Sequence, residues 1–211
     1  MNPRPVLFVL AGVNGAGKSS IGGHLLQRAG LAWFNPDTFA RELVADTGCG
    51  QLEANAVAWQ EGMRRLDAAL HNGTSHAFEP TLGGRTVPAR ILDATRSHDV
   101  ILWFCGLASP EQHLARVRAR VASGGHDIPE AKIRERWLTA QLNLIALMPH
   151  LSQLQVYDNS RDVDVGDPIP DPMLVLELIA GQCTWPNGAE SMAKTPEWAK
   201  ALVEAAMPQM D

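Results

Sequence analysis

Residues 12–19 read Gly-Val-Asn-Gly-Ala-Gly-Lys-Ser and follow the apolar run Val6–Ala11. This stretch matches the phosphate-binding P-loop pattern G-x-x-x-x-G-K-[ST] in full. The apolar run predicts a buried strand, and residues 21–28 after the motif predict a helix. Because a strand, a glycine loop and a helix follow one another in the order that this motif needs, a chance glycine turn is the weaker alternative.

The chemistry of the motif depends on its backbone and on two side chains. Glycines let backbone N–H groups curl around phosphate oxygens, and the helix N-terminus adds a partial positive charge. We expect Lys18 to contact the β- and γ-phosphates and Ser19 to bind Mg²⁺. The stretch therefore predicts a site for a nucleoside triphosphate, ATP, formed by Gly12, Asn14, Gly15, Ala16, Gly17, Lys18, Ser19 and Ser20.

Composition narrows the class of protein. The chain has 211 residues, which suits one domain, and a hydrophobic content of 45%, which is sufficient for a sizeable core. A net charge of -5 argues against a nucleic-acid partner, and no apolar run is long enough to span a membrane. Cys49, Cys105 and Cys183 lie far apart, so neither a zinc site nor a disulfide framework is predicted, which fits the cytoplasm.

Apolar runs alternate with helical patterns along the chain. Strands are expected over residues 6–11, 31–34, 75–79, 100–105 and 154–157, and helices over 21–28, from 38 onward, and over 52–70, 86–96, 110–122 and 129–147. This alternation predicts an α/β fold of the three-layer P-loop NTPase type, with a mostly parallel sheet flanked by helices. Two short helices are expected in the tail, at residues 173–181 and 195–207.

Local signals refine two of these helices. In residues 52–70 the steps of four and three predict one buried face, formed by Leu52, Ala56, Trp59, Met63, Leu66 and Leu70. Gly73 predicts the end of that helix. Ser109 followed by Pro110, with Gln112 three residues after the serine, predicts the start of the helix over residues 110–122.

Three acidic residues follow predicted strands and should gather at one edge of the sheet, namely Asp37, Glu79 and Asp158. Asp37 could accept a proton from an attacking hydroxyl, or it could cap the helix that begins at Thr38. Glu79 could orient Mg²⁺-bound waters or hold a substrate hydroxyl, or it could be a solvated strand end.

Arginines cluster between residues 116 and 136. Arg118 and Arg120 flank the apolar stripe of the first helix, Arg134 and Arg136 flank that of the second, and Arg116 points to solvent on the helical wheel. The two helices, joined by a Gly-Gly-His loop that includes His126, predict a mobile lid that brings arginines to the phosphates. The alternative is that each arginine is a solvated or ion-paired surface residue.

Six stretches in order resemble the zeta-toxin family of P-loop kinases. They are Ala-Gly-Val-Asn-Gly-Ala-Gly-Lys-Ser-Ser (11–20), Phe-Asn-Pro-Asp (34–37), Phe-Glu-Pro-Thr-Leu (78–82), Arg-Val-Ala-Ser-Gly-Gly-His-Asp-Ile-Pro (120–129), residues 133–136 and Tyr-Asp-Asn-Ser (157–160). The resemblance implies the adenylate-kinase-like branch of P-loop folds. We therefore expect a kinase core over residues 1–165, with an arginine-bearing helical lid over about 109–148, and a helical extension over 166–211 packed on it.

The resemblance also implies roles for single residues. Lys18, Asp37, Arg120 and Arg136 correspond to catalytic residues, with Asp37 as the base, and Ser19 corresponds to the Mg²⁺ ligand. Glu79 corresponds to the acid that holds the sugar, Thr81 lies in the stretch that binds substrate, and Arg134 rivals Arg136. Asn159 lies where the last strand of the family approaches the nucleotide base. Pro80 and Gly83 depart from the family pattern, which leaves the identity of the sugar open.

Members of this family phosphorylate UDP-N-acetylglucosamine or related UDP-amino sugars with ATP and Mg²⁺, and many are toxins held off by an antitoxin. The resemblance therefore implies an ATP-dependent small-molecule kinase, with a UDP-sugar substrate and an antitoxin as a candidate partner. A kinase for another nucleotide or metabolite is one alternative, and a non-catalytic ATP-binding module is another. The chain contains no N-K-x-D motif of the kind that guanine-type switches use.

Overall fold

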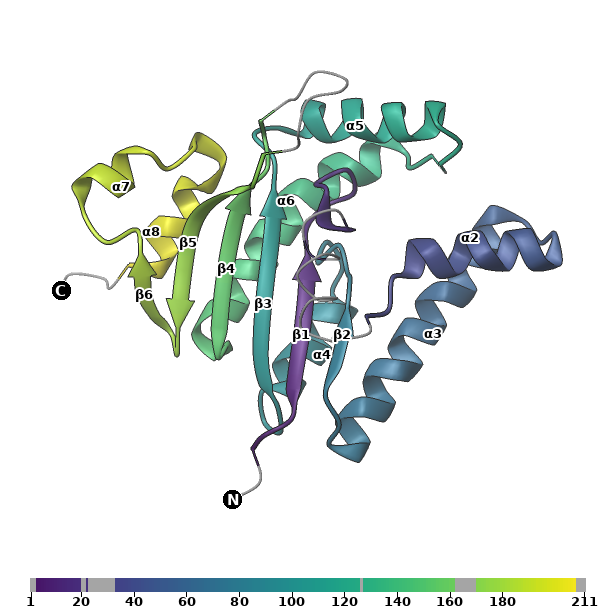
Figure 1. The fold of residues 1–211 in the computed structure, drawn as a ribbon, viewed down its shortest axis with the longest axis horizontal. Helices are drawn as coiled ribbons and strands as arrows, with labels where there is room; N and C mark the ends of the chain where they lie inside the picture. Colours follow the sequence, from purple (N-terminus) through teal and green to yellow (C-terminus); the bar gives the residue numbers. More distant parts are fainter. Residues whose placement is uncertain (1–2, 20–21, 23–32, 126, 162–169, 208–211) are drawn as a thin grey trace.

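The computed structural model describes residues 3–19, 22, 33–125, 127–161 and 170–207. Its centre is a six-stranded sheet in the order β2-β1-β3-β4-β5-β6 (Figure 1). The first four strands in chain order pair in parallel and the last two pair antiparallel: β1 (Val6–Ala11), β2 (His76–Phe78), β3 (Asp99–Gly106), β4 (Gln153–Asp158), β5 (Met173–Ile179) and β6 (Gln182–Trp185). The predicted mostly parallel sheet is confirmed.

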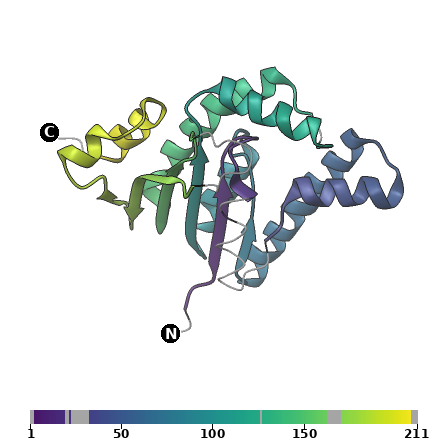
Figure 2. The same cartoon turned by 45° about the horizontal axis from the view of Figure 1, so that its top comes forward.

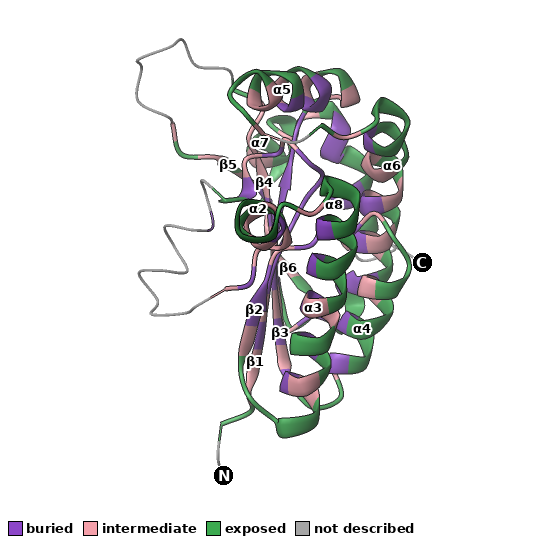
Figure 3. Cartoon of the chain, turned by 90° about the vertical axis from the view of Figure 1, so that its right-hand side faces the viewer, coloured by how far each residue is buried: buried purple, intermediate pink, exposed green. Residues whose placement is uncertain are grey.

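Helices α3, α4, α6 and α8 lie along one face of this sheet (Figure 3). The helical elements are α2 (Pro36–Thr47), α3 (Gln51–Asn72), α4 (Thr86–Ala94), α5 (Pro110–Ala122), α6 (Glu130–Leu147), η1 (Met148–His150), α7 (Ala189–Ala193), η2 (Glu197–Ala199) and α8 (Lys200–Ala206). The core between the helices and the sheet is continuous and includes Leu102 of β3, Leu144 of α6 and Leu202 of α8. None of the described helices is long and apolar enough to cross a membrane.

Capping residues set several helix ends where the sequence predicts them. The Ser109 hydroxyl accepts a hydrogen bond from the Gln112 backbone N–H at the start of α5, and Pro110 is the first helical residue. Gly73 closes α3 in the left-handed conformation, with φ of 62°. Pro129 precedes α6, as expected.

The buried face of α3 differs from the prediction. Leu52 is 86% exposed and Trp59 is 50% exposed, so the expected stripe through these two residues is wrong. The face that is buried is formed mostly of small residues, namely Ala54, Ala58, Gly62, Leu66 and Ala69. Ala54 and Ala58 pack against Ala40 of α2, and this close helix pair needs small side chains at the contact.

The tail also differs from the prediction. Residues 173–179 form β5 instead of a helix, and this strand pairs antiparallel with β4. Ala180 and Gly181, with φ of 50° and 77°, form the two-residue turn to β6, as a tight hairpin requires. The second expected tail helix corresponds to η2 and α8.

The helix expected at residues 21–28 and most of the strand expected at 31–34 lie outside the described residues. Phe34 forms an isolated parallel bridge with Phe78 of β2, so the chain leading into α2 runs beside the sheet edge. Figure 2 shows the resulting arrangement: α2 and α3 form a pair beside the β2 edge of the sheet, and α5 lies over the carboxyl ends of the strands.

Candidate active site

The P-loop follows β1 and begins where the strand reaches the carboxyl edge of the sheet. Gly15 and Gly17 have φ of 84° and 83°, a conformation that favours glycine. A Cβ at Gly17 would also lie 2.5 Å from Asn159 Nδ2, so this position has no room for a side chain. Lys18 and Ser19 are helical and follow the loop directly.

A buried histidine of α5 forms a hydrogen bond with the backbone of the P-loop. His113 of α5 is 1% exposed, and its Nδ1 lies 2.9 Å from the Asn14 carbonyl oxygen. Burial lowers the pKa of His113 to about 4, so the ring is neutral at physiological pH. Because the partner is a carbonyl oxygen, which can only accept, Nδ1 carries the ring proton and its N–H donates the hydrogen bond to the loop.

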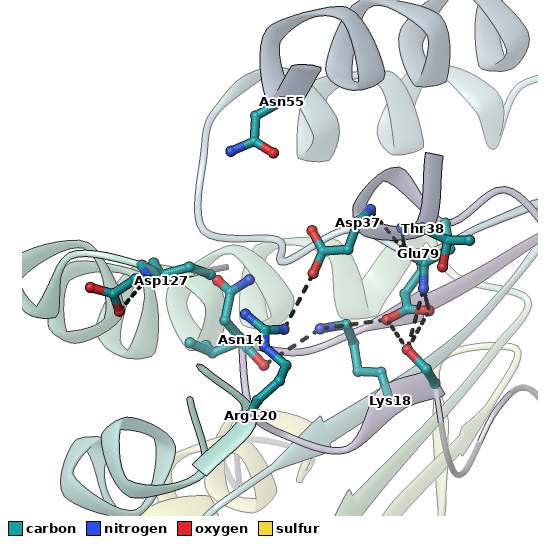
Figure 4. Close-up of polar contacts among 12 residues, drawn as sticks. Asn14, Lys18, Asp37, Thr38, Asn55, Glu79, Arg120 and Asp127 are labelled. Atoms are coloured by element: carbon teal, nitrogen blue, oxygen red, sulfur yellow. Dashed lines mark hydrogen bonds and ion pairs between the residues drawn. The ribbon is translucent and has the colours of Figure 1, made fainter. Parts of the chain in front are cut away.

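Glu79, at the end of β2, connects with the two chemically active residues of the P-loop (Figure 4). Its Oε1 accepts a hydrogen bond from Ser19 Oγ at 3.0 Å and lies 3.9 Å from Lys18 Nζ. Both charged side chains are buried, at 7% and 9% exposure. Burial raises the pKa of Glu79, and the positive charge of Lys18 and the hydrogen bond from Ser19 offset part of that rise.

Asn35 is the residue of this network that the sequence reasoning missed. Its Nδ2 donates to Glu79 Oε2 at 2.8 Å and to Ser19 Oγ at 3.2 Å. Its Oδ1 accepts from the backbone N–H groups of Asp37 and Thr38. Asn35 is therefore the N-cap of α2, and the alternative that Asp37 caps this helix is wrong. An Asn before Pro and Asp is a recognisable start signal that could have identified it.

Asp37 lies in the first turn of α2 and is exposed toward the lid helices. Its Oδ2 is 3.5 Å from Nη1 of Arg120, which comes from the last turn of α5 (Figure 4). The structure thus brings together the predicted base and one of the predicted lid arginines.

The remaining lid arginines separate into two groups. Arg136 of α6 is half-buried, and its Nη1 donates to Asn14 Oδ1 of the P-loop at 2.8 Å. Burial lowers the pKa of Arg136, and Asp37 and Glu135 oppose that effect. Arg134 instead forms surface ion pairs with Glu111 and Glu130, at 2.7 and 2.8 Å.

Arg118 and Arg116 also take positions away from the cavity described below. Arg118 pairs with Glu130 at 3.6 Å and is 74% exposed, as a surface residue would be. Arg116, which the helical wheel places in solvent, is half-buried, and its Nη2 donates to the Asn159 and Arg161 carbonyl oxygens. It ties α5 to the segment after β4, so the solvent prediction for Arg116 is wrong.

The two residues at the end of β4 take different roles. Asn159 Nδ2 donates to the Ala16 carbonyl oxygen at 2.9 Å, so this predicted nucleotide-binding residue lies against the P-loop. Asp158 accepts a hydrogen bond from Trp198 Nε1 at 2.9 Å and another from Ser160. These bonds give Asp158 a structural role. Ser20 and His126, two other residues singled out from the sequence, lie outside the described residues.

A cavity of about 500 Å³ opens beside the P-loop, between the α2–α3 pair, the loop after β2 and the start of α6. The predicted residues that line it are Asn14, Asp37, Glu79, Thr81 and Arg136. Side chains of α3 form another part of the wall, and Asn55 projects from that helix toward the space that Asp37 faces (Figure 4). The cavity is large enough for a small molecule and meets the P-loop at its most polar side.

The residues present fit ATP with Mg²⁺. The loop has the glycine conformations and the helix start that cradle phosphates, and Lys18 is buried beside it. Ser19 Oγ and the Glu79 carboxylate place oxygen ligands at the same point, which suits Mg²⁺. The described residues contain no cluster of three His, Cys, Asp or Glu side chains that could hold a metal alone. A P-loop Mg²⁺ ion takes phosphates and waters as its other ligands, so it needs no such cluster.

Comparison with known proteins supports the P-loop assignment. A family model described as an AAA domain matches residues 7–141. None of the curated protein sequences matches the chain. The structure is similar to the AvrRxo1-ORF1:-ORF2 complex with ATP, with a TM-score of 0.65 and 17% identity. That match covers 100% of this chain and 66% of the other, so this chain spans just under two thirds of its length.

Two other solved structures share the fold. A chain from the PezAT toxin–antitoxin system of Streptococcus pneumoniae has a TM-score of 0.57 and 16% identity, over 74% of this chain and 68% of that one. A putative kinase from Chloroflexus aurantiacus has a TM-score of 0.51 and 20% identity, over 64% and 78%. At such identities the likeness shows the fold alone, which is a P-loop kinase-like fold.

Proposed function

Because the chain belongs to the AAA domain family and carries a complete P-loop, we propose that it is an ATP-dependent kinase. Its reaction transfers the γ-phosphoryl group of ATP to a hydroxyl of a small molecule. The observation that carries this proposal is the junction of the 500 Å³ cavity with the P-loop. At this junction Asp37, Glu79 and Arg136 face the space that an acceptor would occupy.

The proposed mechanism assigns one task to each charged group. Asp37 accepts the proton of the acceptor hydroxyl, since it lines the cavity next to the P-loop. Bound ATP with Mg²⁺ would supply the phosphoryl group and part of the charge neutralisation. Lys18, Arg120 and Arg136 surround the position of the transferring group with positive charge, which stabilises the transition state.

Glu79 has two tasks that its position supports equally. It contacts Ser19 and Lys18 on the phosphate side, where it would orient Mg²⁺-bound waters. It also lines the cavity, where it would hold a second hydroxyl of the acceptor. Helices α5 and α6 would exclude water during transfer, which limits wasteful hydrolysis of ATP.

For the acceptor, we propose UDP-N-acetylglucosamine or a related UDP-amino sugar. The support is the resemblance of six ordered sequence stretches to the zeta-toxin family, together with the fold shared with a PezAT chain. An antitoxin protein is the partner that this proposal implies. Comparing growth during expression of the wild type and of Lys18→Ala tests that implication, since equal growth would argue against a toxic activity.

The function is tested by following phosphoryl transfer from ATP and Mg²⁺ to UDP-N-acetylglucosamine with product analysis by mass spectrometry. We expect Lys18→Ala and Asp37→Asn to lower kcat by about 100-fold or more, because each removes a group that acts in the transition state. Asp46→Asn, an exposed aspartate of the same helix, and Lys194→Ala, a surface lysine, are the matched controls.

The outcomes separate the parts of the proposal. Transfer that is lost in both variants and kept in both controls supports the sugar kinase and its base. Near wild-type transfer by Asp37→Asn would overturn the role of Asp37. ATP consumption without a phosphorylated sugar would overturn the acceptor, and mass spectrometry of a mixed metabolite pool would then identify another. ATP binding with no product in that pool would favour the non-catalytic module.

A further inference from the structure

Trp59 is a large aromatic side chain that the fold leaves half-exposed inside the candidate site. It lies in the middle of α3, is 50% exposed and lines the cavity beside the P-loop. Ala54 and Ala58 of α3 form the buried contact with Ala40 of α2, and Trp59 is not part of that cluster. An exposed indole in a cavity wall is a surface on which a flat ring can stack.

Trp59 has a polar neighbour, Asn55, and an apolar one, Met63, one turn away on either side along α3. Asn55, one turn earlier on α3, also lines the cavity, and its Oδ1 accepts a hydrogen bond from Gln51 at 2.9 Å. No described residue accepts a hydrogen bond from its Nδ2. Gly62, three residues after Trp59, is buried, and a Cβ there would lie 3.0 Å from the ring of Phe34, which also lines the cavity. A planar ring with polar edges therefore finds a stacking face and an amide on the same stretch of helix.

The wall of the cavity also carries basic side chains away from the P-loop, namely Arg85 and Lys132. Arg85 lines it from the loop before α4 and forms no ion pair with another described residue. Lys132 lines the opposite side, although it pairs with Glu135 at 3.0 Å. Basic side chains in the same cavity wall as a stacking face fit an acceptor in which phosphates link a ring to a hydroxyl.

We propose that Trp59, with Asn55, forms a subsite for the nucleobase of a nucleoside diphosphate sugar, whose sugar hydroxyl then faces Asp37. This inference rests on the proposed kinase function and adds the part of the site that selects the acceptor. Trp59 is a specificity residue that contacts the ring and takes no part in the transfer step. A sugar phosphate without a base would leave the indole exposed and bind more weakly.

The test is calorimetric titration of the protein saturated with Mg²⁺ and a non-hydrolysable ATP analogue. UDP-N-acetylglucosamine, ADP-glucose and GDP-mannose are the ring-bearing probes, and N-acetylglucosamine 1-phosphate is the probe without a ring. We expect Trp59→Ala to raise the Kd of ring-bearing probes by about 5- to 150-fold, as stacking on an aromatic side chain does for a base. Trp59→Phe should restore most of the affinity. Leu52→Ala, on the same helix and 86% exposed, should have no effect.

The result that supports the subsite is a wild-type preference for a ring-bearing probe over N-acetylglucosamine 1-phosphate that disappears in Trp59→Ala and returns in Trp59→Phe. Equal affinity of the wild type for probes with and without a ring, or binding of none of them, would overturn it. Calorimetry does not depend on turnover. Trp59-dependent binding without transfer would therefore contradict the proposed kinase function and leave the nucleobase subsite intact.

Discussion

A single amide, that of Asn35, connects the two halves of the candidate site. Its Oδ1 accepts hydrogen bonds from the first turn of α2, which carries Asp37. Its Nδ2 donates hydrogen bonds to Glu79 and Ser19 beside the P-loop. The buried Glu79 carboxylate has lost most of its contact with water. The hydrogen bond that it accepts from Asn35 therefore has a large effect on its charge and orientation. Asn35 thus fixes the distance between the proposed base and the phosphate side of the site.

Asn35→Asp and Asn35→Ala separate the two tasks of this side chain. Both variants lose the donors to Glu79 and Ser19, and we expect kcat to fall by about 10- to 100-fold in each. Only Asn35→Asp keeps an acceptor for the α2 N–H groups, whereas Asn35→Ala loses a cap of about 1 kcal/mol. Amide hydrogen exchange at Asp37 and Thr38, whose N–H groups bond to the Asn35 side chain, measures the cap, and steady-state kinetics measures the effect on kcat.

A wild-type kcat in Asn35→Asp would show that the cap is the whole contribution of Asn35. Thr47→Ala, at the opposite end of α2, is the matched control, because its hydroxyl bonds only within and just after that helix. It should leave kcat unchanged.

The residues at the strand ends could be predicted because parallel strands bring their carboxyl ends to one edge. This rule predicts Asp37 and Glu79, whereas the P-loop pattern predicts Lys18. The structure places Asp37 and Glu79 in the wall of one cavity and Lys18 beside Glu79. The apolar stripe of α6 does not distinguish Arg134 from Arg136, since both flank it. Only the resemblance favoured Arg136, and the packing against the P-loop separates the positions of the two side chains. Side-chain pairs that join distant segments have no signature in the local sequence.

At the scale of elements, signals that act within a few residues predicted well. The Ser109 cap and Gly73 set helix ends because the bonds that they make are local. The phase of α3 was wrong because the small residues, and not the large ones, face α2. The helix expected at residues 173–181 was also wrong. The apolar run of β5 fits either a helix or a strand, and only the pairing with β4, which is remote in sequence, makes it a strand.

The lid helices provide a matched comparison at this scale. Arg120 and Arg136 face Asp37 and the P-loop, whereas Arg118 and Arg134 lie on the same two helices and pair with surface glutamates. We expect alanine at either inner arginine to lower kcat by about 100- to 1,000-fold, because a preorganised donor to the transferring group is lost. Alanine at either outer arginine removes only an exposed ion pair and should change kcat less than about twofold.

Steady-state kinetics of the four single variants measures the contrast. A loss in Arg134→Ala as large as that in Arg136→Ala would return Arg134 to the site and would require the start of α6 to rotate on closing. Thermal unfolding of the same variants serves as the control for folding.

At the scale of the whole molecule, the C-terminal segment extends the sheet that carries the site. Strand β5 pairs with β4, and α8 contributes Leu202 and Val203 to the main core. Trp198 of η2 packs on the end of β3, where a Cβ on Gly106 would collide with its indole. The centroids of the Trp198 and Phe104 rings are 6.5 Å apart. The division into a core of residues 1–165 and a separate extension stays a prediction, and these contacts argue that the two parts fold together.

Trp198→Ala tests this coupling between the tail and the strand ends below the P-loop. The indole is 7% exposed and its Nε1 donates to Asp158, so we expect the free energy of unfolding to fall by about 3–5 kcal/mol in urea denaturation. Trp198→Phe keeps the ring and loses the hydrogen bond, which should cost about 1–2 kcal/mol. Met192→Ala, on exposed α7, should stay within about 0.5 kcal/mol of the wild type. An early, separate transition in Trp198→Ala that leaves a stable core would instead show that the tail unfolds alone, because a single cooperative unit loses stability in one step.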